Sequence, residues 1–139
     1  MSAARRTPTG RTVVLGYVPS KIGLAALAAA IGECRRRGAR LLVLNTTRAD
    51  RHVDPNYAHA TAMEELDAAL RAGGVDFEVR HFTSSQLASE DVLDAAEETG
   101  AELVVVGIRR RTPVGKLILG SDAQRIILDA DCPVLAVKA

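Results

Sequence analysis

Short apolar runs alternate along the chain with longer segments in which apolar residues recur every three or four positions. The runs are rich in Val, Leu and Ile, and their length is typical of strands buried on both faces of a sheet. The longer segments have the spacing of one face of an amphipathic helix. This pattern predicts strands at 12–17, 40–45, 76–82, 101–106 and 134–137, and helices at 21–37, 57–72, 89–99 and 121–129.

Capping residues mark the ends of several predicted helices. Ser20 stands before the first helix as an N-cap, and Gly38 follows it as a C-cap. The arginines at 35–37 are well placed against the negative end of that helix dipole. Gly73-Gly74 and Gly100 end the second and third helices in the same way, so the helix boundaries follow from local chemistry. Ser89 is the cap candidate for the third helix, without a full capping box.

Strict alternation of strands and helices predicts a single-domain α/β fold with an open parallel five-stranded sheet and helices on both faces. The run 76–82 alternates apolar and polar residues, which indicates a half-exposed edge strand. In the strand order 3-2-1-4-5, the first and fourth strands are neighbours, and their carboxyl ends form the crevice in which such sheets bind ligands. Residues 1–10 are predicted to be a disordered tail before a domain at 11–139.

The amino-acid composition argues against several classes of function. The 139 residues are 47% hydrophobic and 25% charged, which is ordinary for one globular domain. A net charge of +1 offers no global attraction to nucleic acid or to an anionic membrane, and 3% aromatic residues without Trp argue against base stacking. The chain has no signal-peptide core and no apolar run of membrane-spanning length, so we expect a cytoplasmic location.

Cysteine and histidine positions predict neither a disulfide nor a metal site. Cys34 and Cys132 are far apart and belong to no CxxC pattern, which favours reduced thiols over a structural disulfide. His52 and His59 have no third ligand at a suitable spacing. We therefore expect both histidines at the surface and no bound metal.

The segment 107–121 joins the most apolar strand to the last helix and reads GIRRRTPVGKLILGS. A basic, glycine-containing loop that leads into a helix N-terminus is typical of an anion site. Lys116 is followed by Leu where a P-loop needs Ser or Thr, and no GxGxxG follows the first strand. The chain also offers no GxSxG elbow or Cys/His pair, so we predict binding and no catalytic residue.

The carboxyl-terminal third resembles the signature of universal stress proteins, and element order and length agree over nearly the whole chain. The segment reads VVVGIRRRTPVGKLILGSDAQRIILDADCPVLAV. Nucleotide-binding members of that family carry Gly, two residues, Gly, nine residues, and then Gly-Ser or Gly-Thr. Gly107 holds the first place, Gly120 and Ser121 hold the last two, and Arg110 replaces the middle glycine. The resemblance implies a Rossmann-like, adenine nucleotide alpha hydrolase-like fold.

The resemblance further implies a regulatory or stress-response domain that binds ATP or AMP without turnover. Arg110 removes one close backbone approach but adds a charge that pairs with phosphate. Val18-Pro19-Ser20 replaces the Asp-Gly-Ser turn common in binding members, and Asp122 at the helix start would repel a triphosphate. The implied contacts are Gly107, Arg109, Arg110, Gly120 and Ser121 for phosphate, and Val18 and Leu44 for the base.

Two other functions remain open. In the first, the chain is an interaction module without nucleotide, and Arg109, Arg110 and Arg111 dock an acidic protein or another anion. In the second, the chain is a weak nucleotide hydrolase, for which Asp122 and His81 are the only candidate bases. The resemblance also implies a homodimer that pairs the strand beginning at Val134 (134–137) across a two-fold axis, since an apolar terminal strand would be a poor bare edge.

Overall fold

The computed structural model describes residues 10–45, 59–81, 87–108 and 119–138. Its five strands are all parallel and form one sheet in the order β3-β2-β1-β4-β5, which confirms the predicted order. The elements are β1 (Thr12–Tyr17), α1 (Lys21–Arg37), β2 (Arg40–Asn45), α2 (His59–Gly73), β3 (Phe77–His81), α3 (Ala88–Thr99), β4 (Leu103–Ile108), α4 (Ser121–Asp129) and β5 (Val134–Lys138).

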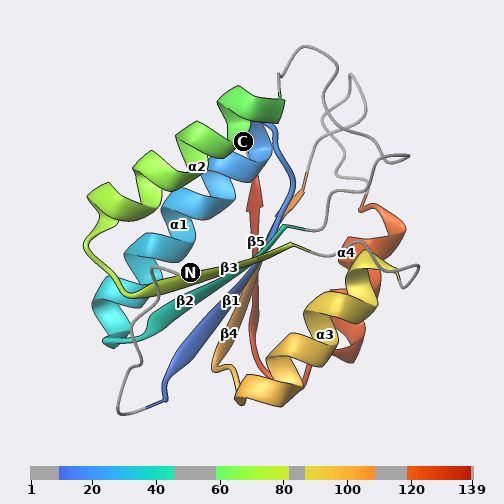
Figure 1. Ribbon diagram of the computed structural model, residues 1–139. Helices are drawn as coiled ribbons and strands as arrows, with labels where there is room; N and C mark the ends of the chain where they lie inside the picture. Colours follow the sequence, from blue (N-terminus) through green and yellow to red (C-terminus); the bar gives the residue numbers. More distant parts are fainter. Residues whose placement is uncertain (1–9, 46–58, 82–86, 109–118, 139) are drawn as a thin grey trace.

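Two helices cover each face of the sheet, with α1 and α2 on one side and α3 and α4 on the other (Figure 1). Successive strand residues point to opposite faces, so Leu15 packs in the cluster beneath α1 while Val14 packs in the cluster beneath α3. Both side chains are completely buried. Coverage of both faces explains why the central strands are continuous apolar runs instead of alternating ones.

Local capping defines α1 as the sequence predicts. The Ser20 hydroxyl accepts a hydrogen bond from the Gly23 N–H at 3.0 Å, and Gly38 adopts the left-handed conformation with a φ of 65°. Arg35 Nε donates to the Gly73 carbonyl at 2.8 Å and so ties the end of α1 to the end of α2. The basic last turn of α1 therefore contributes to helix packing as well as to the helix dipole.

Several element boundaries differ from the sequence prediction, and two of these differences have a clear structural cause. Helix α3 begins at Ala88, so Ser89 is not its cap and lies buried in the first turn. The Glu90 carboxylate instead accepts the N–H of Leu87, the N-cap residue, at 3.3 Å. Strand β4 continues through Gly107 and Ile108 because these residues pair with β5.

An ion-pair network joins the amino-terminal ends of β1 and β4. Glu102 accepts from Arg11 Nε at 2.8 Å and from Arg37 Nη1 at 2.9 Å, and Arg37 also bonds Glu33 at 3.0 Å. These guanidinium groups hold the pKa of Glu102 below its ordinary value. The network lies at the opposite end of the strands from the predicted ligand crevice.

Candidate functional site

A cavity of about 110 Å³ lies at the carboxyl ends of β1 and β4, where the sequence predicts a ligand crevice. Its walls come from both strand ends and from the first turns of α3 and α4. The lining residues are Gly16 and Val18 after β1, Val106 and Gly107 of β4, Ala88 and Val92 of α3, and Asp122, Ala123 and Ile126 of α4.

Four of the predicted site residues lie at this cavity or border it. Val18 and Gly107 line it from the ends of β1 and β4, and the Val18 side chain is 37% exposed. Gly120 is the N-cap of α4 and Ser121 is its first residue. Since the next residue, Asp122, lines the cavity, the helix N-terminus borders it directly. The strand order thus brings two segments remote in sequence to one place.

The other predicted contacts are placed differently. Leu44 is fully buried in the cluster that contains Val92, and it does not line the cavity. Arg109, Arg110 and Arg111 lie outside the described residues. Their contacts with phosphate or with an acidic partner therefore stay predictions of the sequence.

The two candidate bases do not meet at the cavity. Asp122 lines it, whereas His81 ends the edge strand β3, with its Nδ1 3.2 Å from the Asn45 side-chain nitrogen. Strands β2 and β1 lie between β3 and β4 in the sheet. Among the described residues that line the cavity, no nucleophile stands beside a base, and the arrangement suits binding.

The two predicted phosphate glycines differ in their surroundings. A Cβ built at Gly107 would overlap Ile22 Cγ2 and would lie 3.2 Å from the Ile22 carbonyl oxygen, so glycine here allows α1 to pack closely on β4. Gly120 has an ordinary φ of −67°, and no atom of the described chain lies within 4 Å of a Cβ built there. Packing explains Gly107, while Gly120 opens onto free space at the start of α4.

The turn after β1 is closed by its own hydrogen bonds. The Ser20 hydroxyl donates to the Val18 carbonyl at 3.3 Å while it caps the Gly23 N–H. A Cβ at Gly23 would overlap that same Val18 carbonyl oxygen, so only glycine fits beneath the turn. The hydroxyl of Ser20 is therefore occupied by helix capping, and the turn presents the apolar Val18 side chain to the cavity.

The first turns of α3 and α4 are joined beside the cavity by Asp122. Its Oδ1 accepts the backbone N–H of Ser89 at 3.3 Å, which satisfies one of the free donors at the start of α3. One turn along α4, Arg125 pairs instead with Glu90 at 3.4 Å and with Asp129 at 3.5 Å. The sequence suggests an interaction of Asp122 with its own helix, but no local signal reveals this bond to the neighbouring one.

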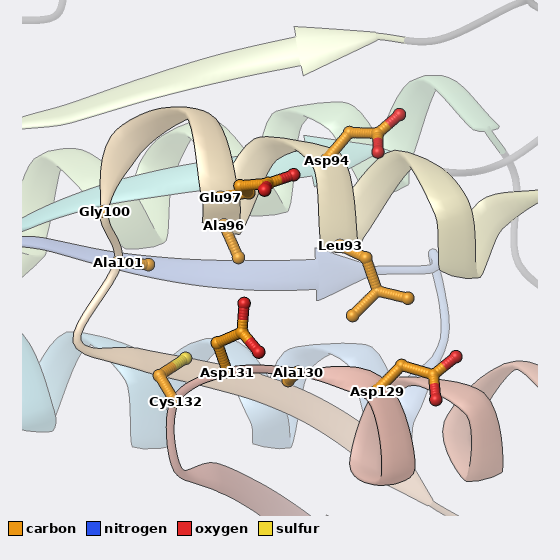
Figure 2. A pocket seen from close by; sticks show the side chains of 10 residues that line it. All are labelled: Leu93, Asp94, Ala96, Glu97, Gly100, Ala101, Asp129, Ala130, Asp131 and Cys132. Carbon is orange, nitrogen blue, oxygen red and sulfur yellow. The ribbon is translucent and has the colours of Figure 1, made fainter.

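A second cavity, of about 320 Å³, lies between the later turns of α3 and the end of α4. Figure 2 shows four carboxylates around it, Asp94 and Glu97 from α3, Asp129 at the end of α4, and Asp131 in the turn after α4. The described residues contain no group of three or more side chains suited to hold a metal ion. No local pattern in the sequence predicts this cavity, because its lining residues belong to two separate helices and the turns after them.

Both cysteines are free thiols, as predicted. Burial raises the pKa of Cys34 to about 12. Burial and the neighbouring Asp131 also raise the pKa of Cys132, which lines the acidic cavity. At neutral pH neither thiol is activated as a nucleophile.

No helix within the described ranges has the length and apolar character needed to cross a membrane.

Comparison with solved structures agrees with this architecture. A universal stress protein from Archaeoglobus fulgidus in complex with dAMP superimposes with a TM-score of 0.67 at 25% identity, over 92% of this chain and 97% of that one. A universal stress protein in complex with cAMP gives a TM-score of 0.69 at 25% identity, over 92% and 96% of the two chains. Both proteins share the fold of this chain, the first in complex with dAMP and the second in complex with cAMP.

Sequence comparison extends the likeness to nearly the whole chain. A universal stress protein of Mycolicibacterium smegmatis is 44% identical over 126 residues, which cover 91% of this chain and 96% of that protein. The model of the universal stress protein family matches residues 10–138, which include both segments that form the cavity between β1 and β4. The chain belongs to the universal stress protein family.

Proposed function

We propose that this protein is a stress-response or regulatory domain that binds an adenine nucleotide at the cavity between the ends of β1 and β4, without turning it over. The observation that carries the proposal is the open N-terminus of α4 at Gly120, beside a largely apolar cavity at the switch point of the sheet. Two structural relatives are described in complex with dAMP and with cAMP.

The phosphate end of the ligand binds at the start of α4. Backbone N–H groups in the first turn of a helix have no partner within the helix, and the helix dipole makes this end favourable for anions. Gly120 leaves space for a close approach, and the exposed Ser121 supplies a hydroxyl at the same place. ATP and AMP both present the phosphate that such a site requires.

The nucleoside lies against the apolar walls. Val18, Val92 and Val106 provide a surface for the base or the ribose, without a carboxylate at the turn after β1. The cavity of about 110 Å³ is smaller than the roughly 300 Å³ at which small-molecule pockets begin, so the described residues enclose only part of a nucleotide. The predicted contacts of Arg109 and Arg110 would add to this part of the site.

Calorimetric titration with ATP, ADP and AMP tests the proposal, together with a mass spectrum of any nucleotide that copurifies. Gly120→Ala fills the open space and should weaken binding at least about tenfold, because the phosphate loses its close approach. Gly32→Ala is the matched control, since it makes the same change within α1, where the new Cβ would meet only the Arg36 side chain at ordinary contact distance.

The absence of heat at millimolar concentrations of all three nucleotides would contradict nucleotide binding. Equal effects of Gly120→Ala and Gly32→Ala would contradict the placement of the phosphate. If nucleotides leave the wild type unaffected while Arg110→Glu loses a protein partner, the interaction-module interpretation would replace this one.

We also propose that the protein forms a homodimer through β5. This strand is at the edge of the sheet, bonded to β4 on one side, and its Val134, Leu135, Ala136 and Val137 side chains are half-buried. Pairing with a second copy would satisfy the outer backbone groups of the strand. Sedimentation equilibrium should show a dimer, and a monomer at all concentrations would contradict it.

A further inference from the structure

One charge is present in the wall of the cavity between β1 and β4. Among the described residues that line it, Asp122 is the only ionisable one. It is the second residue of α4 and directly follows Ser121, where the proposed function places the phosphate. A ligand with further phosphate groups would therefore bring more negative charge to the part of the cavity that this carboxylate lines.

The position of the Asp122 carboxylate is maintained by a hydrogen bond across the two helices. Its Oδ1 accepts the Ser89 N–H at 3.3 Å, so the group belongs to the contact between α3 and α4. The side chain is half-buried, which restricts its retreat into water. A ligand that enters the cavity thus meets a positioned negative charge.

The charge of Asp122 is not neutralised by a nearby cation within the described part of the chain. Arg125 is the nearest arginine along α4, and its guanidinium pairs with Glu90 and Asp129. No ion pair there involves Asp122. Among the described residues, the favourable contribution to anion binding comes from the two helix N-termini, each equivalent to roughly half a positive charge, and the carboxylate offsets much of it.

The geometry points to Asp122 as a specificity-determining residue that limits the ligand to one phosphate group, as in a nucleoside monophosphate or a cyclic nucleotide, and disfavours diphosphates and triphosphates. This inference rests on the proposed nucleotide site. Each additional negative charge within about 8 Å of the carboxylate weakens binding on the order of threefold at moderate ionic strength, so the two further charges of ATP together weaken it about tenfold. ATP should consequently bind more weakly than AMP or cyclic AMP.

The sharpest test is Asp122→Asn, because the amide oxygen still accepts the Ser89 N–H while the charge is removed. Dissociation constants for AMP, cyclic AMP, ADP and ATP would be measured by calorimetry in the presence of a metal chelator. We expect wild type to bind AMP at least about tenfold more tightly than ATP. In the variant this ratio should fall about tenfold, mainly through tighter ATP binding.

Asp131→Asn is the matched control. It removes the same charge near the other end of α4, beside the acidic cavity, and should leave the ratio of ATP to AMP dissociation constants unchanged. A salt series on wild type tests the same charge without any variant. Raising ionic strength from about 0.05 M to about 0.5 M should bring the ratio of ATP to AMP dissociation constants closer to one, because screening weakens the repulsion between Asp122 and the additional phosphates.

The outcomes separate this inference from the proposed function. An unchanged ratio in Asp122→Asn, a wild type that prefers ATP, or a ratio insensitive to salt would overturn the role of Asp122 while leaving nucleotide binding intact. Failure of wild type and variant to bind any of the four nucleotides would overturn both. If Asp122→Asn does not fold, the wild-type ratio and its salt series still decide the question.

Discussion

The two cavities beside the α3 and α4 pair are built by the same helices but have opposite electrostatic character. At the carboxyl edge of the sheet, both helices begin, and one carboxylate lines the cavity. At the other edge, the C-caps Gly100 and Ala130 line a larger cavity together with four carboxylates. Helix dipoles add positive charge to the first and negative charge to the second.

This difference follows from the topology of a parallel sheet. Each helix returns the chain to the starting edge of the next strand, so all helix N-termini lie at the edge where the strands end. An anion is therefore favoured at only one of the two cavities. The size of a cavity is therefore a poor guide to its ligand, since the four carboxylates of the larger cavity disfavour phosphate.

The largest expected effect comes from adding a second carboxylate to the smaller cavity. Ala123→Glu should weaken nucleotide binding on the order of a hundredfold, because it would place another negative charge among the lining residues. Ala130→Glu makes the same change at the acidic cavity and should leave binding unchanged. Calorimetric titration of both folded variants checks the contrast, and equal losses would refute it.

A second test compares close packing with open space at the two glycines. Gly107→Ala should lower the free energy of unfolding by about 1–3 kcal/mol, because the new methyl group would overlap Ile22 beneath α1. Gly120→Ala should change it by less than about 0.5 kcal/mol. Urea unfolding measures both values. A large loss at Gly120 would mean that its open space is needed for folding and not for a ligand.

A third test measures the electrostatic difference between the two cavities as a change in protein stability. Asp122→Asn should destabilise the protein by about 0.5–1 kcal/mol, since a charged acceptor at two helix N-termini is lost. Asp131→Asn should instead stabilise it by about 0.3–1 kcal/mol, because a carboxylate just beyond the end of α4 opposes the helix dipole. The midpoint temperatures of thermal unfolding of the two variants should therefore shift in opposite directions from that of the wild type. Shifts of the same sign would contradict the contrast.

The smallest expected effect is on the pH dependence of stability. It concerns Glu102, a carboxylate at the amino-terminal edge of the sheet that has cationic partners. Arg11 and Arg37 lower the pKa of Glu102 from its ordinary 4.5, so the folded state favours its ionised form. This contribution to stability is present above about pH 4.5 and disappears as pH falls through the lowered folded pKa. Glu102→Gln should reduce the loss of stability in that acidic range, measured as the urea midpoint against pH.

Local patterns were sufficient for elements whose ends carry their own signals. Helix α1 begins and ends as predicted because Ser20 and Gly38 cap it through neighbouring residues. The end of β4 could not be predicted from the local sequence, since Gly107 and Ile108 become strand residues only by pairing with β5. Ser89 looked like a cap because serine is a common N-cap residue, although Leu87 is the N-cap and the Glu90 carboxylate accepts its N–H.

The α/β class, the crevice between the first and fourth strands, and the helix that begins at Ser121 could be predicted without coordinates. Hydrophobic period and capping act between near neighbours, and the alternation of strands and helices implies an open parallel sheet with a crevice at its carboxyl edge. Only the tertiary structure separated Gly107, which accommodates Ile22, from Gly120, which opens onto free space. It alone joined Asp122 to α3 and gathered four carboxylates at the opposite edge. Such contacts depend on where the sheet places distant segments, and no local pattern records that position.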